Sequence, residues 1–397
     1  MKKYLFLIAA AALGFASCSN DDVVAENTGL NDANAISFRS FVQGATRAAD
    51  VDANAGANGL KTLGFKVRAT LTSGGTQYFP ETLFEWNNTS GTYNSTQKYY
   101  WPQTEALDFF AWTASGNDVT HTENTYAFNV TPNATAASQS DLVVANTVNK
   151  TKAGTYDPND VYNTSSGSKT SSYGTNGVPL NFRHAGAKVT ITLNNTNTDG
   201  LDFVIRDASI CNVKNSGVFT FNPATANTDG KNATTLDIAQ WNISAATNTS
   251  YTQAITTLTT LSQDWILVPQ TLTYETTYND ADANDAFTGP CIKVSLKIKN
   301  HGSEIYIVGA ASGENDGYVT AMWPLSAPAS GWVPGKKYTY TVDLAGGGYF
   351  EKNTTGDMGL DPILAGAEIK FVTVTVDDWS AGDATGVYTG GTTPVTP

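Results

Sequence analysis

The sequence is poor in charge and in histidine. Only 15% of its 397 residues are Asp, Glu, Lys or Arg, against roughly 25% in an average soluble domain. The 23 Lys and Arg residues face 36 Asp and Glu, for a net charge of −13, and the bases form no cluster, which excludes a nucleic-acid partner. Three histidines are too few for His-based metal sites or proton-transfer networks. We therefore predict no catalytic residue, no metal and no cofactor, and a protein that is not an enzyme.

Long apolar runs are also lacking. The one short run, residues 4–12, follows Lys2 and Lys3 and cannot span a bilayer, so it predicts a secretory signal peptide over 1–17. The run ends in FASC, where small residues precede Cys18 as in a lipobox, although Phe15 departs from the usual Leu. We therefore predict that Cys18 is the lipidation site. The SNDD that follows is similar to the acidic export signal of surface lipoproteins in Bacteroidetes.

Only two cysteines, Cys211 and Cys291, remain beyond the predicted lipid anchor. Both lie beside β-rich runs, where a thiol behaves as a small hydrophobic group. Buried core thiols are the favoured interpretation, and the sequence leaves their pairing open.

Aromatic residues and turn formers are abundant: aromatics make up 11% of the chain, which contains 35 glycines. Short runs with alternating apolar residues recur from Leu63 to Val376, separated by Gly, Asn, Ser, Thr and Pro clusters. No helical periodicity longer than about three turns appears, so the sequence predicts an all-β fold. The strands form two blocks that break at NNTNTDG, Asn194–Gly200, which predicts two tandem β-sandwich domains.

A separate strand is predicted before the first block. Ile36, Phe38 and Val42 share one face of an alternating segment, the period of a half-buried strand. A stretch of small and polar residues with glycines follows. It contains Arg47, which without further context is interpreted as an ordinary loop arginine.

The chain resembles the fimbrillin family, the pilin and adhesin subunits of type V pili in Bacteroidetes. The resemblance runs from the signal peptide to Trp379 and rests on motifs in order: FASC, ISF at Ile36, TRA at Thr46–Ala48, KYYWP at Lys98–Pro102, LDFFAW at Leu107–Trp112, SDLVVA at Ser140–Ala145, LNFRHAGAKVTITL at Leu180–Leu193, WILVPQ at Trp265–Gln270, WVPGKKYTYTVDL at Trp332–Leu344 and IKFVTVTVDDW at Ile369–Trp379.

The resemblance implies a fold of two tandem β-sandwiches and a mechanism. Precursors of such subunits carry a lipid (palmitate) anchor at the outer membrane, and an arginine-specific protease cuts them. Carried onto this chain, Arg47–Ala48 is the scissile bond and the strand with Ile36, Phe38 and Val42 is removed. A strand from another pilus subunit then fills the groove.

The predicted organisation follows from these assignments. It begins with a signal peptide over 1–17 and a tether with the removable strand over 18–47. An N-terminal sandwich over 48–196 and a C-terminal sandwich over 197–379 follow, and a flexible tail over 380–397 ends the chain. The expected location is the outer membrane and the extracellular pilus. A ligand on a host or bacterial surface is a candidate partner.

The donor strand and the position in the pilus stay open. The tail after Trp379 is rich in Gly and Pro and makes a poor strand. The better candidate donor contains Val372, Val374 and Val376, alternating with threonines. A chain that donates poorly fits a tip subunit, so stalk and tip are both retained.

Other features support weaker alternatives. Tyr278–Phe287 resembles the start of an EF-hand loop, but Asp285 and Cys291 stand where Gly and Glu are needed, so a hairpin loop is favoured over calcium. His184 is interpreted as a structural histidine, because no nucleophile motif accompanies it. Tryptophans could stack on sugars, with Trp323, Trp332 and Trp379 the least certain to be core. The alternative function is a lipid-anchored, carbohydrate-binding adhesin that does not polymerise.

Overall fold

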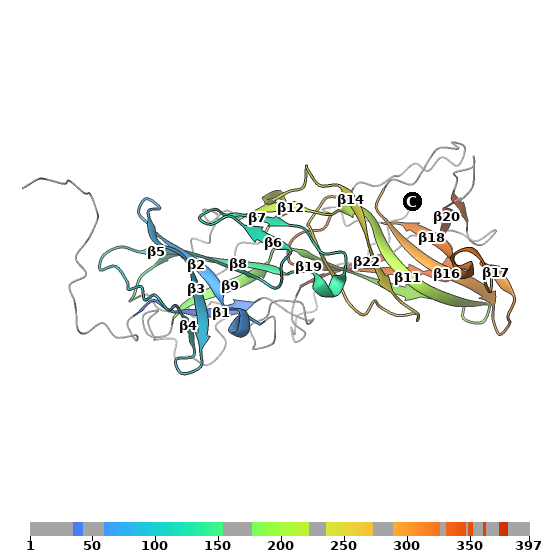
Figure 1. Cartoon of the computed structure of the whole chain (residues 1–397), viewed down its shortest axis with the longest axis horizontal. Coiled ribbons are helices and arrows are strands. Elements are labelled where there is room, and N and C mark those ends of the chain that lie inside the picture. Colours follow the sequence, from blue (N-terminus) through green and yellow to red (C-terminus); the bar gives the residue numbers. More distant parts are fainter. Residues whose placement is uncertain are drawn as a thin grey trace, which may run out of the picture.

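The computed structural model describes residues 35–42, 59–153, 177–221, 236–272, 289–325, 331–346, 348–351, 360–362 and 373–379. Their fold is all-β, as predicted. The described ranges contain one α-helix, α1 (Leu60–Leu63), and short 3₁₀ turns at Ala136–Ser138, Ile238–Gln240, Glu314–Gly317 and Leu344–Gly346. The molecule is elongated along the direction from the early strands to the late ones (Figure 1).

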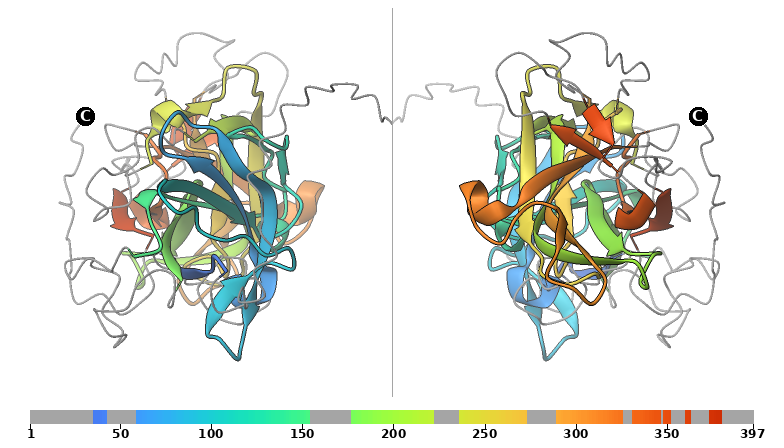
Figure 2. Two further views of the ribbon diagram at one scale, coloured as in Figure 1. Left: turned by 90° about the vertical axis from the view of Figure 1, so that its left-hand side faces the viewer. Right: turned by 90° about the vertical axis from the view of Figure 1, so that its right-hand side faces the viewer.

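Seven strands of the N-terminal part close into a barrel in the order β1-β4-β3-β2-β5-β8-β9. They are β1 (Phe38–Val42), β2 (Phe65–Leu71), β3 (Gln77–Asn87), β4 (Thr92–Asn94), β5 (Leu107–Ala114), β8 (Leu142–Lys150) and β9 (Val178–His184). The alternating side chains of these strands fill the barrel with an aromatic core that includes Phe65, Phe79, Phe84, Phe109 and Phe182. Figure 2, left, looks onto this end of the molecule.

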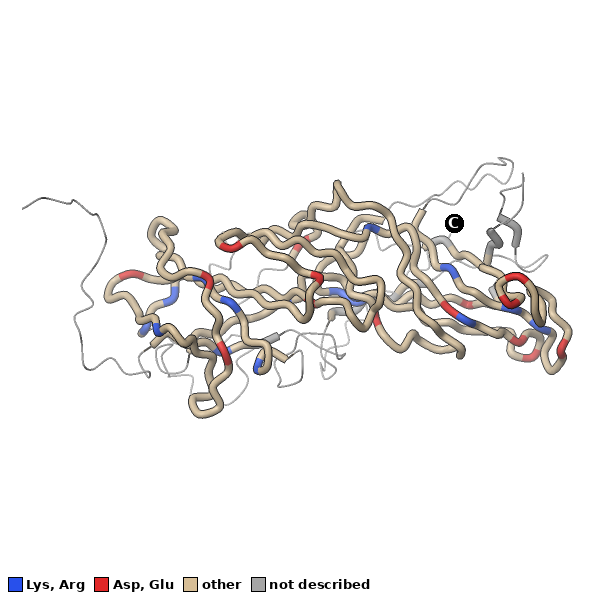
Figure 3. Tube along the Cα trace, in the orientation of Figure 1, with Lys and Arg blue, Asp and Glu red and all other residues tan. Residues whose placement is uncertain are grey.

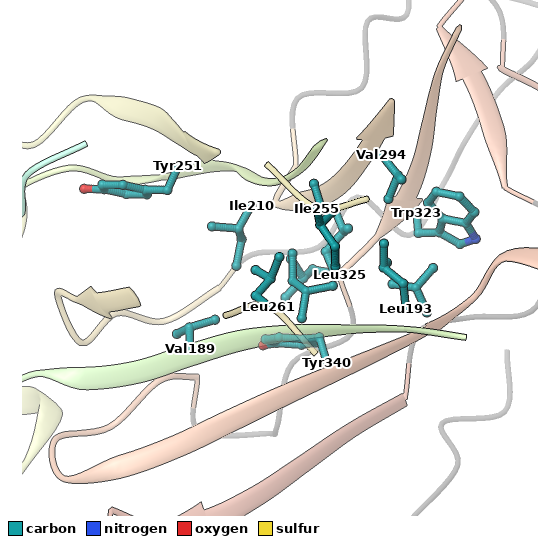
Figure 4. Close-up of a cluster of buried hydrophobic side chains, with 14 of the residues drawn as sticks. Val189, Leu193, Ile210, Tyr251, Ile255, Leu261, Val294, Trp323, Leu325 and Tyr340 are labelled. Atoms are coloured by element: carbon teal, nitrogen blue, oxygen red, sulfur yellow. The ribbon is translucent and has the colours of Figure 1, made fainter. Parts of the chain in front are cut away.

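Two further sheets enclose a second core. One has the order β15-β10-β19-β22, with bounds Trp265–Leu267, Ala187–Asn194, Lys336–Asp343 and Thr373–Asp378. The other has the order β14-β11-β16-β18-β20-β21, with β17 beside β16, and bounds Asn248–Ala254, Leu201–Lys214, Cys291–Asn300, Val319–Pro324, Tyr349–Glu351, Leu360–Pro362 and, for β17, Tyr306–Val308. Aliphatic side chains and Tyr251, Trp323 and Tyr340 pack between them (Figure 4).

A small fourth sheet lies between the barrel and the second core. Its order is β13-β12-β7-β6, with bounds Trp241–Asn242, Gly217–Thr220, Ala127–Val130 and Val119–His121. Phe128 and Phe219 of this sheet pack with Phe110 and Val144 on the outside of the barrel. Strand pairing therefore crosses the predicted boundary at 196–197: β12 pairs with β7, and β10 pairs with β15 and β19. The two-domain division stays a prediction.

Several side chains singled out in the sequence are part of the cores. Trp323, Trp332 and Trp379 are at most 2% exposed, so these tryptophans serve packing rather than sugar stacking. Cys211 and Cys291 are buried and lie directly opposite each other in the pairing of β11 with β16. Tyr278–Phe287, the segment similar to an EF-hand loop, lies outside the described residues.

Along the described part of the trace, Lys and Arg positions alternate with Asp and Glu positions (Figure 3). His184 is structural, as expected: its Nδ1 lies 2.8 Å from Oδ2 of the buried Asp141, and its ring stacks on Trp379 at 4.0 Å.

The described ranges contain no group of three or more His, Cys, Asp or Glu placed to hold a metal. In the same ranges, no helix has the length and apolarity to cross a bilayer.

One buried hydrogen bond in the second core gives a direct test of its packing. Trp332 Nε1 donates to Tyr340 Oη at 2.8 Å, and both side chains are fully buried. Tyr340→Phe leaves the indole N–H without that acceptor, so we expect a loss of about 1–3 kcal/mol in the free energy of unfolding. Urea denaturation measures it. Tyr306→Phe, on the half-buried surface of β17, is the matched control and should change stability by no more than about 0.5 kcal/mol.

Candidate functional site

The predicted removable strand, β1, lies within the barrel wall. It runs parallel to β9 over five consecutive pairs, from Phe38 opposite Val178 to Val42 opposite Phe182. On its other side, Phe38 lies opposite Tyr93 of β4, antiparallel. Neighbouring backbone bonds continue the pairing: Val178 N donates to Ser37 O at 2.8 Å, and Ile36 N donates to Tyr99 O at 2.7 Å. β1 therefore joins the two edges that would otherwise remain open.

The side chain of Phe38 is the centre of the barrel's aromatic core. It is 0% exposed, and Ile36 is 2% exposed, as the alternation predicts. The Phe38 ring makes edge-to-face contacts with Phe84, Phe109 and Phe65, with centroids 4.8, 5.1 and 6.3 Å away. Each well-placed aromatic pair adds about 0.5–1.5 kcal/mol to the stabilisation by burial alone. Phe38 thus fastens β1 to three different strands.

Gly177 and Tyr93 lie beside β1 in the slot, the name we give to the position of β1 between β9 and β4. Gly177 has φ +77, and a Cβ there would lie 3.0 Å from the Phe38 carbonyl carbon, so only glycine lets β9 begin this close to β1. Ser40 Oγ donates to Tyr93 Oη at 3.0 Å. The sequence does not indicate the roles of Gly177 and Tyr93 or the pairing of β1 with β9, because positions 42 and 178 are far apart in the chain.

The pairing of Ala35 with Tyr100 extends the slot at its beginning. The carbonyl of Tyr100 also accepts a 2.6 Å hydrogen bond from Tyr78 Oη. Partial burial raises the pKa of Tyr78, so this phenol remains a donor at neutral pH.

The other predicted processing residues, Cys18, Arg47 and Ala48, lie outside the described residues. Val42 is the last residue of β1, five positions before Arg47.

The candidate donor strand belongs to the chain's own second core. Val374 and Val376 lie on β22, which pairs antiparallel with β19 over six positions. Val374 is half-buried and packs against the core between the two sheets. Val372 lies outside the described residues. β22 is the last strand of its sheet, so one of its edges has no neighbouring strand among the described residues.

The residue after β22 reaches back to β9. Trp379 N donates to Gly335 O at 2.9 Å, and Gly335 N donates to Gly186 O at 2.9 Å, just beyond β9. The Trp379 ring stacks on His184, the last residue of β9, and Lys188 Nζ lies 4.7 Å from its centroid. The strand that holds β1 therefore also contacts the end of β22.

The chain belongs to the fimbrillin-like family, whose family model matches residues 46–379. This is a family of fimbrial structural subunits rather than a class of enzymes. The match begins after β1 and just before Arg47. No curated protein sequence matches the chain.

Solved structures similar to this chain come from related bacteria. A protein of Bacteroides uniformis proposed to act in cell adhesion is 16% identical, with a TM-score of 0.45, covering 87% of this chain and 100% of its own. A fimbrial protein of Bacteroides vulgatus is 13% identical, with a TM-score of 0.45 and coverages of 87% and 99%. A C-terminally truncated tip fimbrial protein of Porphyromonas gingivalis is 10% identical, with a TM-score of 0.32 and coverages of 87% and 98%.

The contribution of Phe38 can be measured in the uncleaved protein. Phe38→Ala empties the centre of the aromatic core, and we expect a loss of about 3–5 kcal/mol in unfolding free energy. The measurement is urea unfolding followed by tryptophan fluorescence. Leu83→Ala, on β3 of the same barrel and 46% exposed, is the control, with an expected loss within about 0.5 kcal/mol. Equal losses in the two variants would contradict the central position of Phe38.

Proposed function

We propose that this chain is a structural subunit, stalk or tip, of a cell-surface type V pilus that assembles by strand exchange. The observation that carries the proposal is the insertion of β1 between β9 and β4, with Phe38 buried among three aromatic rings. The family match from residue 46 supports it, because the family-defining region begins where the proposed cleavage leaves the mature chain.

The precursor in this proposal is lipidated at Cys18 and held at the outer membrane. An arginine-specific protease cuts between Arg47 and Ala48, beyond the end of β1. The cut converts β1 from a covalently attached strand into a separate peptide, so its dissociation becomes effectively irreversible once it diffuses away. The mature subunit then contributes to adhesion from the extracellular pilus.

Loss of β1 explains why assembly would follow cleavage. The barrel would expose the aromatic wall around Phe84 and Phe109 and the unpaired backbone of β9 at 178–182. Both are costly in water, and an exposed strand edge is a template for another strand. An incoming strand that runs parallel to β9 and places a large apolar residue at the Phe38 position satisfies both requirements.

The donor in this proposal is the C-terminal segment of another copy or of another pilus subunit. β22 offers valines at every second position, the spacing that alternate pockets of the slot require. Donation would require β22 to leave β19, and the contacts of Trp379 with His184 oppose that departure.

Cleavage of the purified, non-lipidated precursor tests the proposal. Arginine-specific protease should convert the monomer into a ladder on a non-boiled denaturing gel. Arg47→Ala should abolish the ladder, whereas Arg206→Ala, at an exposed arginine of β11, should leave it intact. A stable monomer after complete cleavage at Arg47 would refute strand exchange.

A synthetic peptide of residues 35–47 tests the slot directly. Added in excess during cleavage, it should refill the barrel and suppress the ladder, because it supplies Phe38 and the parallel pairing with β9. The same peptide with Phe38→Ala is the matched control and should not suppress it. Equal suppression by both peptides would show that the slot does not select the buried phenylalanine.

Truncation tests the donor. Deleting 380–397 should leave the ladder unchanged, because the removed tail is rich in Gly and Pro and makes a poor strand. The measurement is the same gel after cleavage of the truncated precursor. Disappearance of the ladder would move the donor from β22 into the tail.

A further inference from the structure

A cavity of about 220 Å³ opens on the barrel, and β1 contributes no residue to its lining. It lies over β2, β5 and β8, and residue Tyr126, just before β7, forms part of its wall. The polar residues around it are Arg68, Thr70, Asp108 and Asn146, and Phe110 supplies an apolar side. Drug-sized ligands occupy about 300–1,000 Å³, so this cavity suits a ligand of monosaccharide size.

Arg68 is the unusual member of this group. It is only 7% exposed, and its buried Nε has no hydrogen-bond partner within the described residues. Its guanidinium lies 4.0 Å from the centroid of the Tyr126 ring, a contact that orients the cation without neutralising it. Buried charges in proteins are normally paired with an opposite charge, because desolvation is expensive. The Arg68 guanidinium is therefore suited to bind an anionic ligand.

The other polar groups of the cavity determine which further groups the anionic ligand must carry. The carboxylate of Asp108 accepts hydrogen bonds from Thr72 Oγ1 at 2.6 Å and from Asn149 N at 2.7 Å, so residues on or next to the adjacent strands β2 and β8 hold Asp108 in place. Asn146 Oδ1 accepts from Arg183 Nη2 at 2.7 Å. The buried Nδ2 of Asn146 has no hydrogen-bond partner within the described residues, so it is a second available donor. A phosphate or sulfate would meet repulsion from Asp108. A ligand with one carboxylate and several hydroxyls would not, because a hydroxyl can donate to Asp108.

From this arrangement we infer a binding site for an acidic sugar, a monosaccharide unit that carries one carboxylate. The carboxylate accepts hydrogen bonds from Arg68 and Asn146, the hydroxyls meet Asp108 and Thr70, and an apolar face of the sugar ring lies against Phe110. None of the groups assigned to the sugar lies on β1.

The test is titration of the purified full chain with glucuronic acid and N-acetylneuraminic acid, followed by ligand-observed NMR. Glucose and acetate are the matched probes for the hydroxyls and the carboxylate alone. We expect binding of the acidic sugars at millimolar concentration or below, and at least about tenfold weaker binding of glucose and acetate. Acetate binding as strongly as the sugars would overturn the sugar assignment. Failure of both acidic sugars to bind would overturn the site.

Two variants separate a binding role of Arg68 from a structural one. Arg68→Met keeps the length of the side chain and removes the charge, so binding should fall about tenfold or more while the melting temperature is unchanged or higher. Asn146→Asp places a carboxylate inside the cavity and should block the sugar while raising the melting temperature. Arg206→Met is the control, because Arg206 also lies over a tyrosine, Tyr318, but is paired with Asp207 outside the cavity. Undiminished binding by Arg68→Met, or a lowered melting temperature of that variant, contradicts the inference.

Discussion

The parallel pairing of β1 with β9 is the contact on which the N-terminal barrel depends. The other pairs of neighbouring strands in the barrel are antiparallel, and the last gap is closed by a strand that comes from outside the family-matched region. Parallel pairs need a long crossover connection, and here more than a hundred residues separate Val42 from Val178. β1 pairs with the backbone of β9, and its Phe38 side chain packs in the aromatic core. The barrel is therefore completed by a strand that precedes the family-matched region.

β9 also connects the two ends of the described chain. Its first residues pair with β1, and its last residue, His184, stacks on Trp379 and bonds Asp141. β10 follows after a short turn and enters the second core, where it pairs with β19, the neighbour of β22. β1 therefore pairs with the first part of the segment 178–194, and Trp379, the residue after β22, contacts His184 and Lys188 of the same segment.

The sequence predicts the strands and the buried face of β1 because both follow from alternation: Phe38 and Ile36 are apolar at even spacing and are buried. It does not predict which strands pair. β10 pairs with β15 and β19 although it precedes the predicted boundary, because NNTNTDG is a turn within the fold and strand order depends on long-range packing. Arg68 is a similar case. In the run from Phe65 to Leu71 it occupies an outward position, and its guanidinium contacts the ring of Tyr126, which is distant in the sequence.

The low charge content of the chain makes the burial of Arg68 unusual. Other buried cationic or titratable side chains have polar partners. His184 and His121 lie 2.8 Å from carboxylate oxygens of Asp141 and Glu81, and Lys188 lies 3.9 Å from Asp264. Lys297 donates to the backbone carbonyls of Ala311 and Asp316. Within the described residues, Arg68 Nε has no hydrogen-bond partner, and the guanidinium faces the Tyr126 ring in a cavity that contains a second available donor. Since a methionine would fill the same volume without the cost of desolvation, retention of a cation is explained by a ligand rather than by stability.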